Sequence, residues 1–361
     1  MSEIRTFTVA ADDDGIRLDR WFKRHLPDVS FNIVSRWART GQLRVDGARA
    51  TPGDRVTTGQ TLRVPPDEPA KAAATAKPKR ERAPLSDDQI AFMQDMVIHK
   101  DAQAIVLNKP PGLATQGGTK TTEHVDGLLD ALSYDSESRP KLVHRLDKDT
   151  SGALLIARTT RAAGYFGKAF SSRTARKVYW ALVTGVPDIH DGMIELPLAK
   201  QPGSGGEKMQ VDEKEGAPAR TRYRVIERAG NRAAWVELQP FTGRTHQLRV
   251  HMAAIGHPIL GDGKYGGIDA FLTGSISRKM HLHARRIRID HPDGGQIDVT
   301  AELPDHMRET IDQLGFDLVA GDLAMPEEAP PPTRAEQKQK AKQHAKTIRK
   351  DRKGERRRRG G

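Results

Sequence analysis

The densest group of potentially reactive side chains in this 361-residue chain stands directly before an apolar strand. Residues 144–152 read HRLDKDTSG, and the apolar run ALLI follows at residues 153–156. Charged side chains next to a buried strand are costly unless they are paired or used. Asp147 in this run is therefore either used in chemistry or part of a solvated turn closed by Gly152, in which it bonds only backbone amides. Composition alone favours the turn, because aspartate is common in turns.

Other classes of catalytic centre find little support in the sequence. The chain has no cysteine, which excludes disulfides, thiolate metal sites and thiol nucleophiles. His246 and His251 are five residues apart, a spacing that does not match the i, i+4 pair of a helical zinc site. A metal-dependent phosphodiesterase needs clustered acidic ligands, and Asp147 with Asp149 is too small a set. We expect no metal site, and we expect the histidines to form hydrogen bonds.

The net charge of +12 favours a polyanionic partner, since neutralising phosphates releases counterions. Residues 334–361 hold 13 Lys and Arg against 3 Asp and Glu, a net charge of +10. Only +2 remains for the other 333 residues, so a specific RNA interaction must be argued from the folded part. The N-terminus lacks the apolar core of a signal peptide, and no stretch is long enough to cross a membrane. We expect a cytoplasmic protein.

Residues 1–66 have the pattern of a small, separate domain. Leu18, Trp21, Phe22 and Leu26 lie on one face of a helix that Pro27 ends. A second helix is predicted from a cap at residue 30 to about residue 40, and strands are predicted over 43–45 and 60–64.

Residues 67–88 are rich in Ala, Lys and Pro and predict a linker to a larger domain over residues 89–318. Strands are predicted within 104–107, 152–157, 178–183, 221–226, 233–238 and 286–289. Several are separated only by a turn, which favours an α+β fold with a mixed, mainly antiparallel sheet and flanking helices. Residues 319–361, first Pro-rich and then basic, predict a disordered tail.

The segment HRLDxDTSG resembles the signature of the pseudouridine synthases of the RluA/RluC/RluD type, which modify large-subunit ribosomal RNA. The resemblance implies that Asp147 attacks a target uridine, whose base detaches, rotates and reattaches through carbon. It implies 23S ribosomal RNA as the partner, and neither a metal nor an organic or nucleotide cofactor. LRVPP at residues 62–66 favours the RluC-like branch. We expect a monomer.

Further segments match this family in the expected order: NKPPGLA at residues 108–114, KVYWA at 177–181, TGRTHQLRVHM at 242–252, GHPILGD at 256–262 and MHLHA at 280–284. The resemblance implies that Tyr179 of the Lys-x-Tyr strand stacks on the base and takes part in proton transfer, and that Arg249 pairs with Asp147. It implies that Arg145 fills the place of the extracted uridine, although a phosphate contact is the alternative. The remaining positions expected to contact the substrate are Asn108, Lys109, Arg244, His246 and Leu282.

The N-terminal domain resembles the S4 RNA-binding domain through its two helices and residues 43–47. The resemblance implies a phosphate-facing surface formed by Arg17, Arg20, Arg36, Arg39 and Arg44. A helical module with solvated arginines is the alternative. For the whole chain, the alternative function is a non-catalytic RNA-binding factor for ribosome assembly. The presence of Asp147, Tyr179 and Arg249 at matching positions argues against it.

Overall fold

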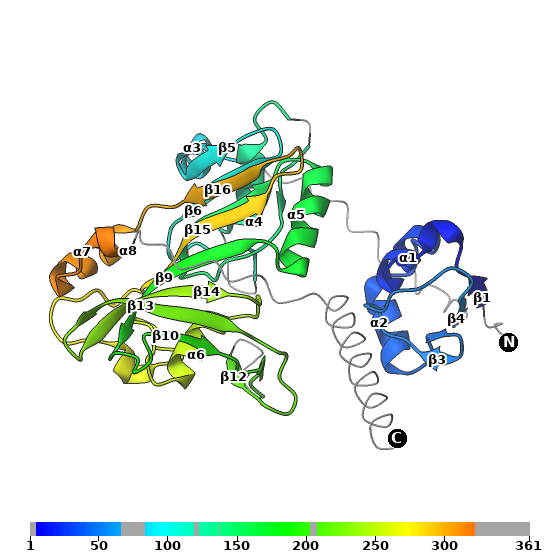
Figure 1. Ribbon diagram of the computed structural model, residues 1–361. Coiled ribbons are helices and arrows are strands. Elements are labelled where there is room, and N and C mark those ends of the chain that lie inside the picture. Colours follow the sequence, from blue (N-terminus) through cyan, green and yellow to red (C-terminus); the bar gives the residue numbers. More distant parts are fainter. Residues whose placement is uncertain (1–4, 66–83, 119–122, 137, 203–207, 322–361) are drawn as a thin grey trace, which may run out of the picture. The chain divides into compact units, whose positions relative to one another are not determined.

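The computed structural model describes residues 5–65, 84–118, 123–136, 138–202 and 208–321, in two compact units that divide after residue 83 (Figure 1). The predicted tail beyond residue 321 and most of the predicted linker lie outside the described residues. Within the described ranges, every helix is too short or too polar to cross a bilayer.

The first unit packs two helices on a four-stranded sheet of order β1-β4-β2-β3. The predicted helices are confirmed, and Leu18, Trp21 and Trp37 are buried in a common core. Ser30 precedes the second helix, but its side chain makes no capping hydrogen bond. The elements are β1 Arg5–Thr8, α1 Leu18–His25, α2 Phe31–Arg39, β2 Arg44–Val45, β3 Ala48–Arg49 and β4 Thr61–Val64, with a 3-10 turn at Ala11–Asp13.

The second unit is built on a ten-stranded sheet whose main path is β10-β13-β14-β9-β15-β8-β6-β5. Only β8 and β15 pair in parallel, so the predicted mixed, mainly antiparallel sheet is confirmed. The strands are β5 Val97–Lys100, β6 Ala104–Lys109, β7 Lys141–Leu142, β8 Ser151–Ala157, β9 Arg176–Thr184, β10 Asp191–Ile194, β11 Leu198–Lys200, β12 Met209–Val211, β13 Thr221–Ala229, β14 Ala233–Pro240, β15 Leu282–Asp290 and β16 Gln296–Thr300.

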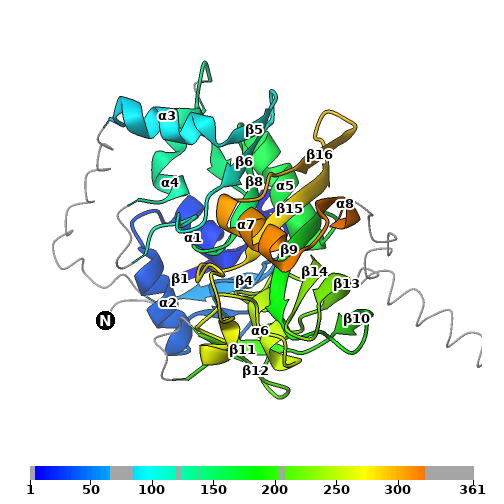
Figure 2. The ribbon, with the colours of Figure 1, turned by 90° about the vertical axis from the view of Figure 1, so that its left-hand side faces the viewer.

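The helices of the second unit cover both faces of this sheet. They are α3 Asp87–Asp95, α4 Val125–Leu128, α5 Thr160–Ser172, α6 Gln247–Ala254, α7 Asp305–Leu314 and α8 Leu318–Gly321, with 3-10 turns at Leu129–Leu132 and Gly267–Ala270. Figure 2 shows α4 and α5 on opposite sides of β6 and β8. Because both faces are covered, β8 is apolar and buried along its whole length instead of alternating.

The two domain boundaries differ from the sequence prediction. Ser86 caps α3 through a reciprocal pair of hydrogen bonds with Gln89, so the second unit begins inside the segment predicted as linker. At the other end, α8 extends the folded part from residue 318 to residue 321. Short polar elements at a domain border carry little periodicity, which is why composition placed both limits inaccurately.

Gly152 follows the loop over residues 143–150, called the reactive loop below, and allows this loop to enter β8 close to β15. Its φ is +106°, a conformation that side chains disfavour, and an added Cβ would lie 2.3 Å from the backbone oxygen of Ala284. The parallel pairing of β8 with β15 therefore depends on a glycine at this position.

We expect Gly152→Ala to lower the free energy of unfolding by about 3 kcal/mol, because backbone strain and a clash with backbone add together. Gly230→Ala is the matched control, since Gly230 also has a positive φ (+58°) but no atom within 4 Å of an added Cβ. Urea denaturation should give a loss of only about 1 kcal/mol for the control. Equal losses would show that the close approach to β15 contributes nothing.

Candidate active site

The loop over residues 143–150, between β7 and β8, is fixed by side chains that bond its backbone and its neighbours. His144 Nε2 accepts a hydrogen bond from the Leu155 N–H at 2.8 Å, and its ring stacks on Phe170 with centroids 4.3 Å apart. Thr115 Oγ1 donates to the backbone oxygen of Leu146 at 2.7 Å. Burial lowers the pKa of His144 to about 3, so the ring is a neutral acceptor that orients the loop.

Lys109 holds the other end of the same loop. Its fully buried Nζ donates to the backbone oxygens of Pro110, Leu113 and Lys148 at 2.9, 2.8 and 3.1 Å. Burial lowers the pKa of Lys109 to about 7. All of its donors are used on backbone, so this lysine ties the Pro-Pro-Gly turn to the reactive loop.

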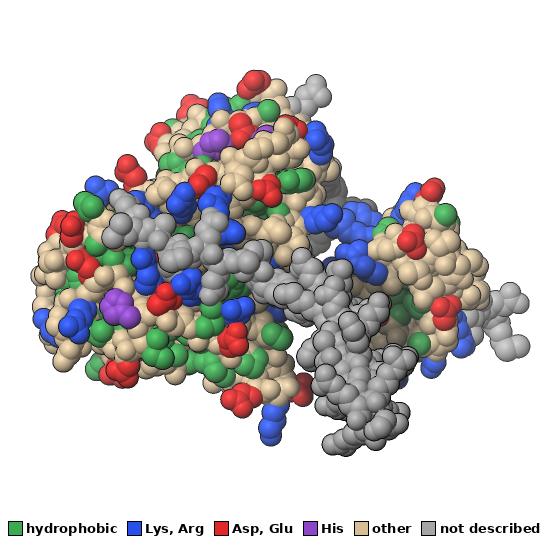
Figure 3. Space-filling model, viewed as in Figure 1, with side chains coloured by type: hydrophobic (Ala, Val, Ile, Leu, Met, Phe, Trp, Pro, Cys, Tyr) green, Lys and Arg blue, Asp and Glu red, His purple; other side chains and the backbone are tan. Residues whose placement is uncertain are grey.

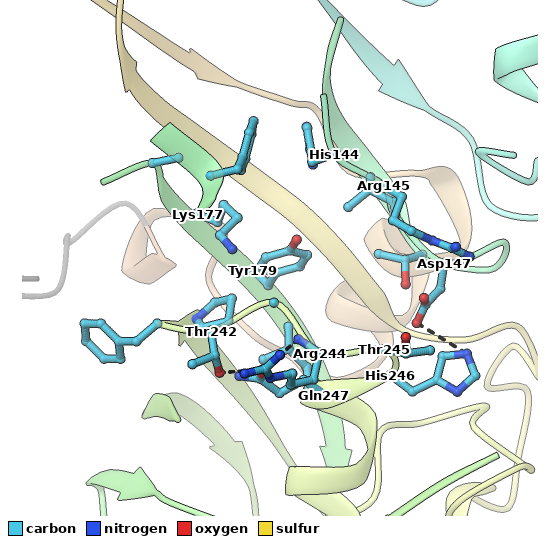
Figure 4. A pocket seen from close by; sticks show the side chains of 18 of the residues that line it. His144, Arg145, Asp147, Lys177, Tyr179, Thr242, Arg244, Thr245, His246 and Gln247 are labelled. Atoms are coloured by element: carbon cyan, nitrogen blue, oxygen red, sulfur yellow. Dashed lines mark hydrogen bonds and ion pairs between the residues drawn. The ribbon is translucent and has the colours of Figure 1, made fainter. Parts of the chain in front are cut away.

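Asp147 lies in this loop, next to two side chains: Arg249 of α6 and His246, the residue just before that helix (Figure 4). Its Oδ2 lies 3.8 Å from Arg249 Nη1 and 3.9 Å from His246 Nε2. Both distances are longer than a hydrogen bond, and one fifth of the Asp147 side chain is exposed. The carboxylate is thus oriented by charge but not consumed by tight pairing.

Arg249 has a stronger partner than Asp147. Its guanidinium forms a two-pronged pair with Asp262, with Nε–Oδ2 and Nη2–Oδ1 distances of 2.7 Å each. The Arg249 and Asp262 side chains are 8% and 1% exposed. Although burial opposes it, hydrogen bonds from Arg249 to Asp262 and the charge of that carboxylate raise the pKa of Arg249. The cation beside Asp147 is therefore permanently charged and fixed in place.

The turn before α6 is organised by the buried amide of Gln247. Its Oε1 accepts from Thr242 Oγ1 at 2.6 Å and from the Arg244 N–H at 3.1 Å, and its Nε2 donates to the backbone oxygen of Arg220 at 3.0 Å. His246 takes a left-handed backbone conformation with φ of 53° at the helix start. This turn aims the His246 ring toward Asp147.

The hydrogen bonds of His246 define which ring nitrogen faces the carboxylate. Tyr265 Oη accepts from the Met209 N–H at 3.0 Å and lies 2.6 Å from His246 Nδ1. When the Tyr265 hydroxyl donates its proton to Nδ1, the N–H of the neutral ring is on Nε2, the atom nearest Asp147. Burial lowers the pKa of His246, which favours this neutral form.

The floor of the site is apolar and comes from two neighbouring strands. Tyr179 of β9 and Leu282 of β15 are both buried and line a pocket with a volume of about 440 Å³. Burial, and then the charge of Asp147, raise the pKa of Tyr179, so its hydroxyl is protonated at neutral pH. A flat aromatic side chain beside a leucine suits a planar ring as ligand.

Positive charge dominates the walls of this pocket. Among the described residues that line it, Asp147 is the one acidic side chain, and five are Lys or Arg: Arg145, Arg173, Lys177, Arg244 and Arg249. Arg244 Nε donates to the backbone oxygen of Pro218 at 3.2 Å. Such a pocket favours an anionic ligand.

The structure brings most of the sequence-predicted positions into this one pocket: Arg145, Asp147, Tyr179, Arg244, His246, Arg249 and Leu282. Asn108 and Lys109 do not line it, which differs from the predicted substrate contacts. Asn108 Nδ2 donates to the backbone oxygen of Glu302 at 3.0 Å, and Lys109 is buried behind the loop. These two residues support the site from outside the pocket.

Sequence reasoning assigned no role to Asp262, Tyr265, Lys177 or Arg173. Asp262 ends the segment GHPILGD at residues 256–262, which matched the family. Its position after a glycine in this segment was the one signal in the sequence that could have identified it. Lys177 lies two residues before Tyr179 on β9, and the period of a strand places both side chains on one face.

The six histidines of residues 246–291 lie at separate places in the second unit. Their ring nitrogens have partners such as Thr310 for His281 (2.9 Å) and Ser151 for His283 (2.9 Å). Burial lowers the pKa of both of these rings to about 4. In the described part of the chain, no three His, Asp or Glu side chains come together as a metal-binding group.

Comparison with known proteins points to one family. The family model described as RNA pseudouridylate synthase matches residues 103–254, a range that contains Asp147, Tyr179 and Arg249. The chain is 34% identical over 318 residues to ribosomal large subunit pseudouridine synthase C of Haemophilus influenzae, covering 87% of this chain and 96% of that protein. It is 32% identical over 316 residues to the protein of the same name in Escherichia coli O157:H7, covering 86% and 97%.

A solved structure shows the same relationship. Human RNA pseudouridylate synthase domain containing 4 superposes with a TM-score of 0.55 at 26% sequence identity. The match covers 65% of this chain and 99% of the human chain.

We expect Asp262→Asn to lower the free energy of unfolding by about 3–5 kcal/mol, because it leaves the buried Arg249 guanidinium without its carboxylate. Asp298→Asn is the matched control. Asp298 forms an equally two-pronged pair with Arg286, at 2.6 Å, but the two side chains are 34% and 42% exposed. Chemical denaturation should give the control a loss below about 1 kcal/mol. Similar losses for both variants would contradict a special role of burial.

Proposed function

Because this chain belongs to the RNA pseudouridylate synthase family, as an RluC-like isomerase acting on RNA, we propose that it converts uridines of 23S ribosomal RNA to pseudouridine with Asp147 as the nucleophile. The relatives named ribosomal large subunit pseudouridine synthase C support this choice of substrate. In the proposed reaction, Asp147 forms a covalent bond to the nucleotide, the bond between the base N1 and the sugar breaks, and the base rotates. A bond from C5 to the sugar then forms, and the bond to Asp147 breaks to restore the free carboxylate. C5 then loses its proton and N1 gains one, so no redox or activated cofactor is required.

One observation carries the proposal: among the described residues that line the pocket, Asp147 is the single carboxylate and the other charged groups are cations. Arg249 places a positive charge 3.8 Å from this carboxylate, and the long contact leaves an Oδ free to approach the nucleotide. Tyr179 and Leu282 supply the flat apolar floor for the detached base. Arg145, exposed beside the nucleophile, is placed to fill the space left by an extracted uridine.

The pKa of Tyr179 links the two halves of the proposed reaction. The negative charge of Asp147 is one of the two causes that raise this pKa. When Asp147 forms a covalent bond to the substrate, that charge disappears and the phenol becomes more acidic. Tyr179 is then better able to exchange protons at the later step, when C5 must lose its hydrogen.

Polyanion binding has support beyond the pocket. Figure 3 shows Lys and Arg side chains gathered over β9, β14 and β15 of the second unit. We also propose that the first unit is an S4-like RNA-binding domain. Among its candidate phosphate contacts, Arg20, Arg36 and Arg39 are exposed. Arg17 pairs with Asp19 at 2.8 Å, and Arg44 donates to the Gly47 backbone oxygen at 2.7 Å. We also propose that the protein acts in the cytoplasm, where ribosomal RNA is found, and that it is a monomer.

We expect the purified chain to form pseudouridine at defined positions of a protein-free 23S ribosomal RNA transcript, and Asp147→Asn to form none while binding RNA within about twofold of wild type. Asp149→Asn is the matched control, since it removes the same charge from the same loop but lies exposed outside the pocket. Chemical mapping of pseudouridine gives the readout. Binding without product by the wild-type chain would favour the non-catalytic assembly factor.

Tyr179→Phe separates stacking from proton transfer. The ring is kept, so we expect RNA affinity to stay within about twofold, while the rate of product formation falls roughly 100-fold, the lower range for acid–base catalysis. Single-turnover kinetics with the mapped RNA measure the rate. A wild-type rate would remove the hydroxyl from the proposed mechanism.

A further inference from the structure

Two of the five cations that line the pocket have no task in the proposed reaction. Arg249 is held by Asp262, Arg244 bonds backbone, and Arg145 lies beside the nucleophile. Lys177 of β9 and Arg173 at the end of α5 remain. Both lie at the α5 end of the pocket. In the view of Figure 4, Lys177 lies on the side of Tyr179 away from Asp147.

Lys177 places a positive charge inside the pocket without a counter-charge from the protein. Within the described residues, no acceptor or carboxylate forms a hydrogen bond or ion pair with its Nζ, and burial alone lowers its pKa, to about 8. His144 close by is neutral. A half-buried ammonium that lines a pocket without a protein partner costs stability, so its presence is explained best by a ligand that supplies the anion.

Arg173 stands where the backbone favours glycine. It follows α5 with φ of 65°, and its N–H closes the helix on the backbone oxygens of Ala169 and Phe170. A left-handed residue at this position is usually Gly, since other side chains are strained there. The exposed Arg173 side chain has no partner among the described residues, so local structure does not require an arginine.

We propose that Lys177 and Arg173 form a phosphate-binding site at the α5 end of the pocket, which receives a phosphodiester of the RNA next to the target uridine. The inference rests on the proposed function and deepens it. A base extracted onto Tyr179 brings its backbone to the pocket mouth, and two cations without protein anions match one phosphodiester charge there. The competing ligand for Lys177 is a carbonyl oxygen of the detached base, which the experiments below distinguish.

The first test measures RNA affinity and its salt dependence with the full chain and a 23S ribosomal RNA transcript. We expect the dissociation constant to rise roughly tenfold for Lys177→Met and about threefold for Arg173→Gly, whose exposed side chain is better screened. Each variant should lower the slope of log K against log salt by about 1. Lys168→Met, an exposed lysine on α5 outside the pocket, is the control and should leave affinity unchanged.

Arg173→Gly also separates binding from folding. Glycine suits the left-handed conformation, so we expect an equal or higher melting temperature together with weaker RNA binding. Unchanged affinity for both variants would overturn the proposal. A fall in the single-turnover rate at saturating RNA for Lys177→Met, with unchanged affinity, would also overturn it, because Lys177 would then act on the base.

The second test neutralises the phosphate instead of the protein. Once the modified uridine is mapped, short RNAs carry an uncharged methylphosphonate on its 5′ or 3′ side. If Lys177 binds that phosphodiester, Lys177→Met weakens binding of the natural RNA but not of one of the modified RNAs. The same loss on all three RNAs would overturn the inference.

The pH dependence gives an independent readout. Lys177 must be protonated to bind phosphate, so kcat/KM for the wild type should fall as the pH rises through about 8. Lys177→Arg keeps its charge and should move this fall to higher pH. Identical profiles would contradict the assignment. If the wild-type chain formed no pseudouridine at all, the proposed function would fail, whatever the binding data show.

Discussion

The buried ion pair between Arg249 and Asp262 is the interaction on which the geometry of the site depends. It joins α6 to the loop that follows residue 260, and it fixes a permanent cation 3.8 Å from Asp147. Both side chains are buried, so loss of one leaves the other as an unpaired buried charge. The proposed role of Asp147 depends on this arrangement, because a nucleophilic carboxylate must be oriented without being tightly bonded.

The lysine and arginine side chains around the site fall into two groups, according to what their donor atoms contact. Lys109 uses its donors on three backbone oxygens, and Arg249 uses its guanidinium on Asp262, so both build the site. Arg145, Arg173 and Lys177 face the pocket and leave their charges available. A positive pocket with one carboxylate is a physical basis for holding RNA phosphate near a nucleophile.

The sequence pattern predicted the frame of the second unit well. Mainly apolar runs such as residues 152–157 and 233–238 identified β8 and β14, because strands covered on both faces are apolar along most of their length. Short elements such as β10, β11 and β12 were not predicted, since three or four residues carry no clear period. The start at α3 was missed because its cap, Ser86, lies in a stretch whose composition resembles a linker.

By itself, the sequence determined the chemistry available: one reactive loop with Asp147, an aromatic strand with Tyr179, a basic helix with Arg249, and no thiol. Tertiary structure decided which of these groups meet. Arg249 forms the expected ion pair with Asp147, at 3.8 Å, but its hydrogen bonds go to Asp262, which the sequence did not indicate. Lys109, expected to contact substrate, uses its donors on backbone oxygens. The hydrophobic period of the sequence predicts on which face of a helix or strand a side chain lies. Which buried groups come within hydrogen-bond distance depends on how strands and loops far apart in sequence pack together.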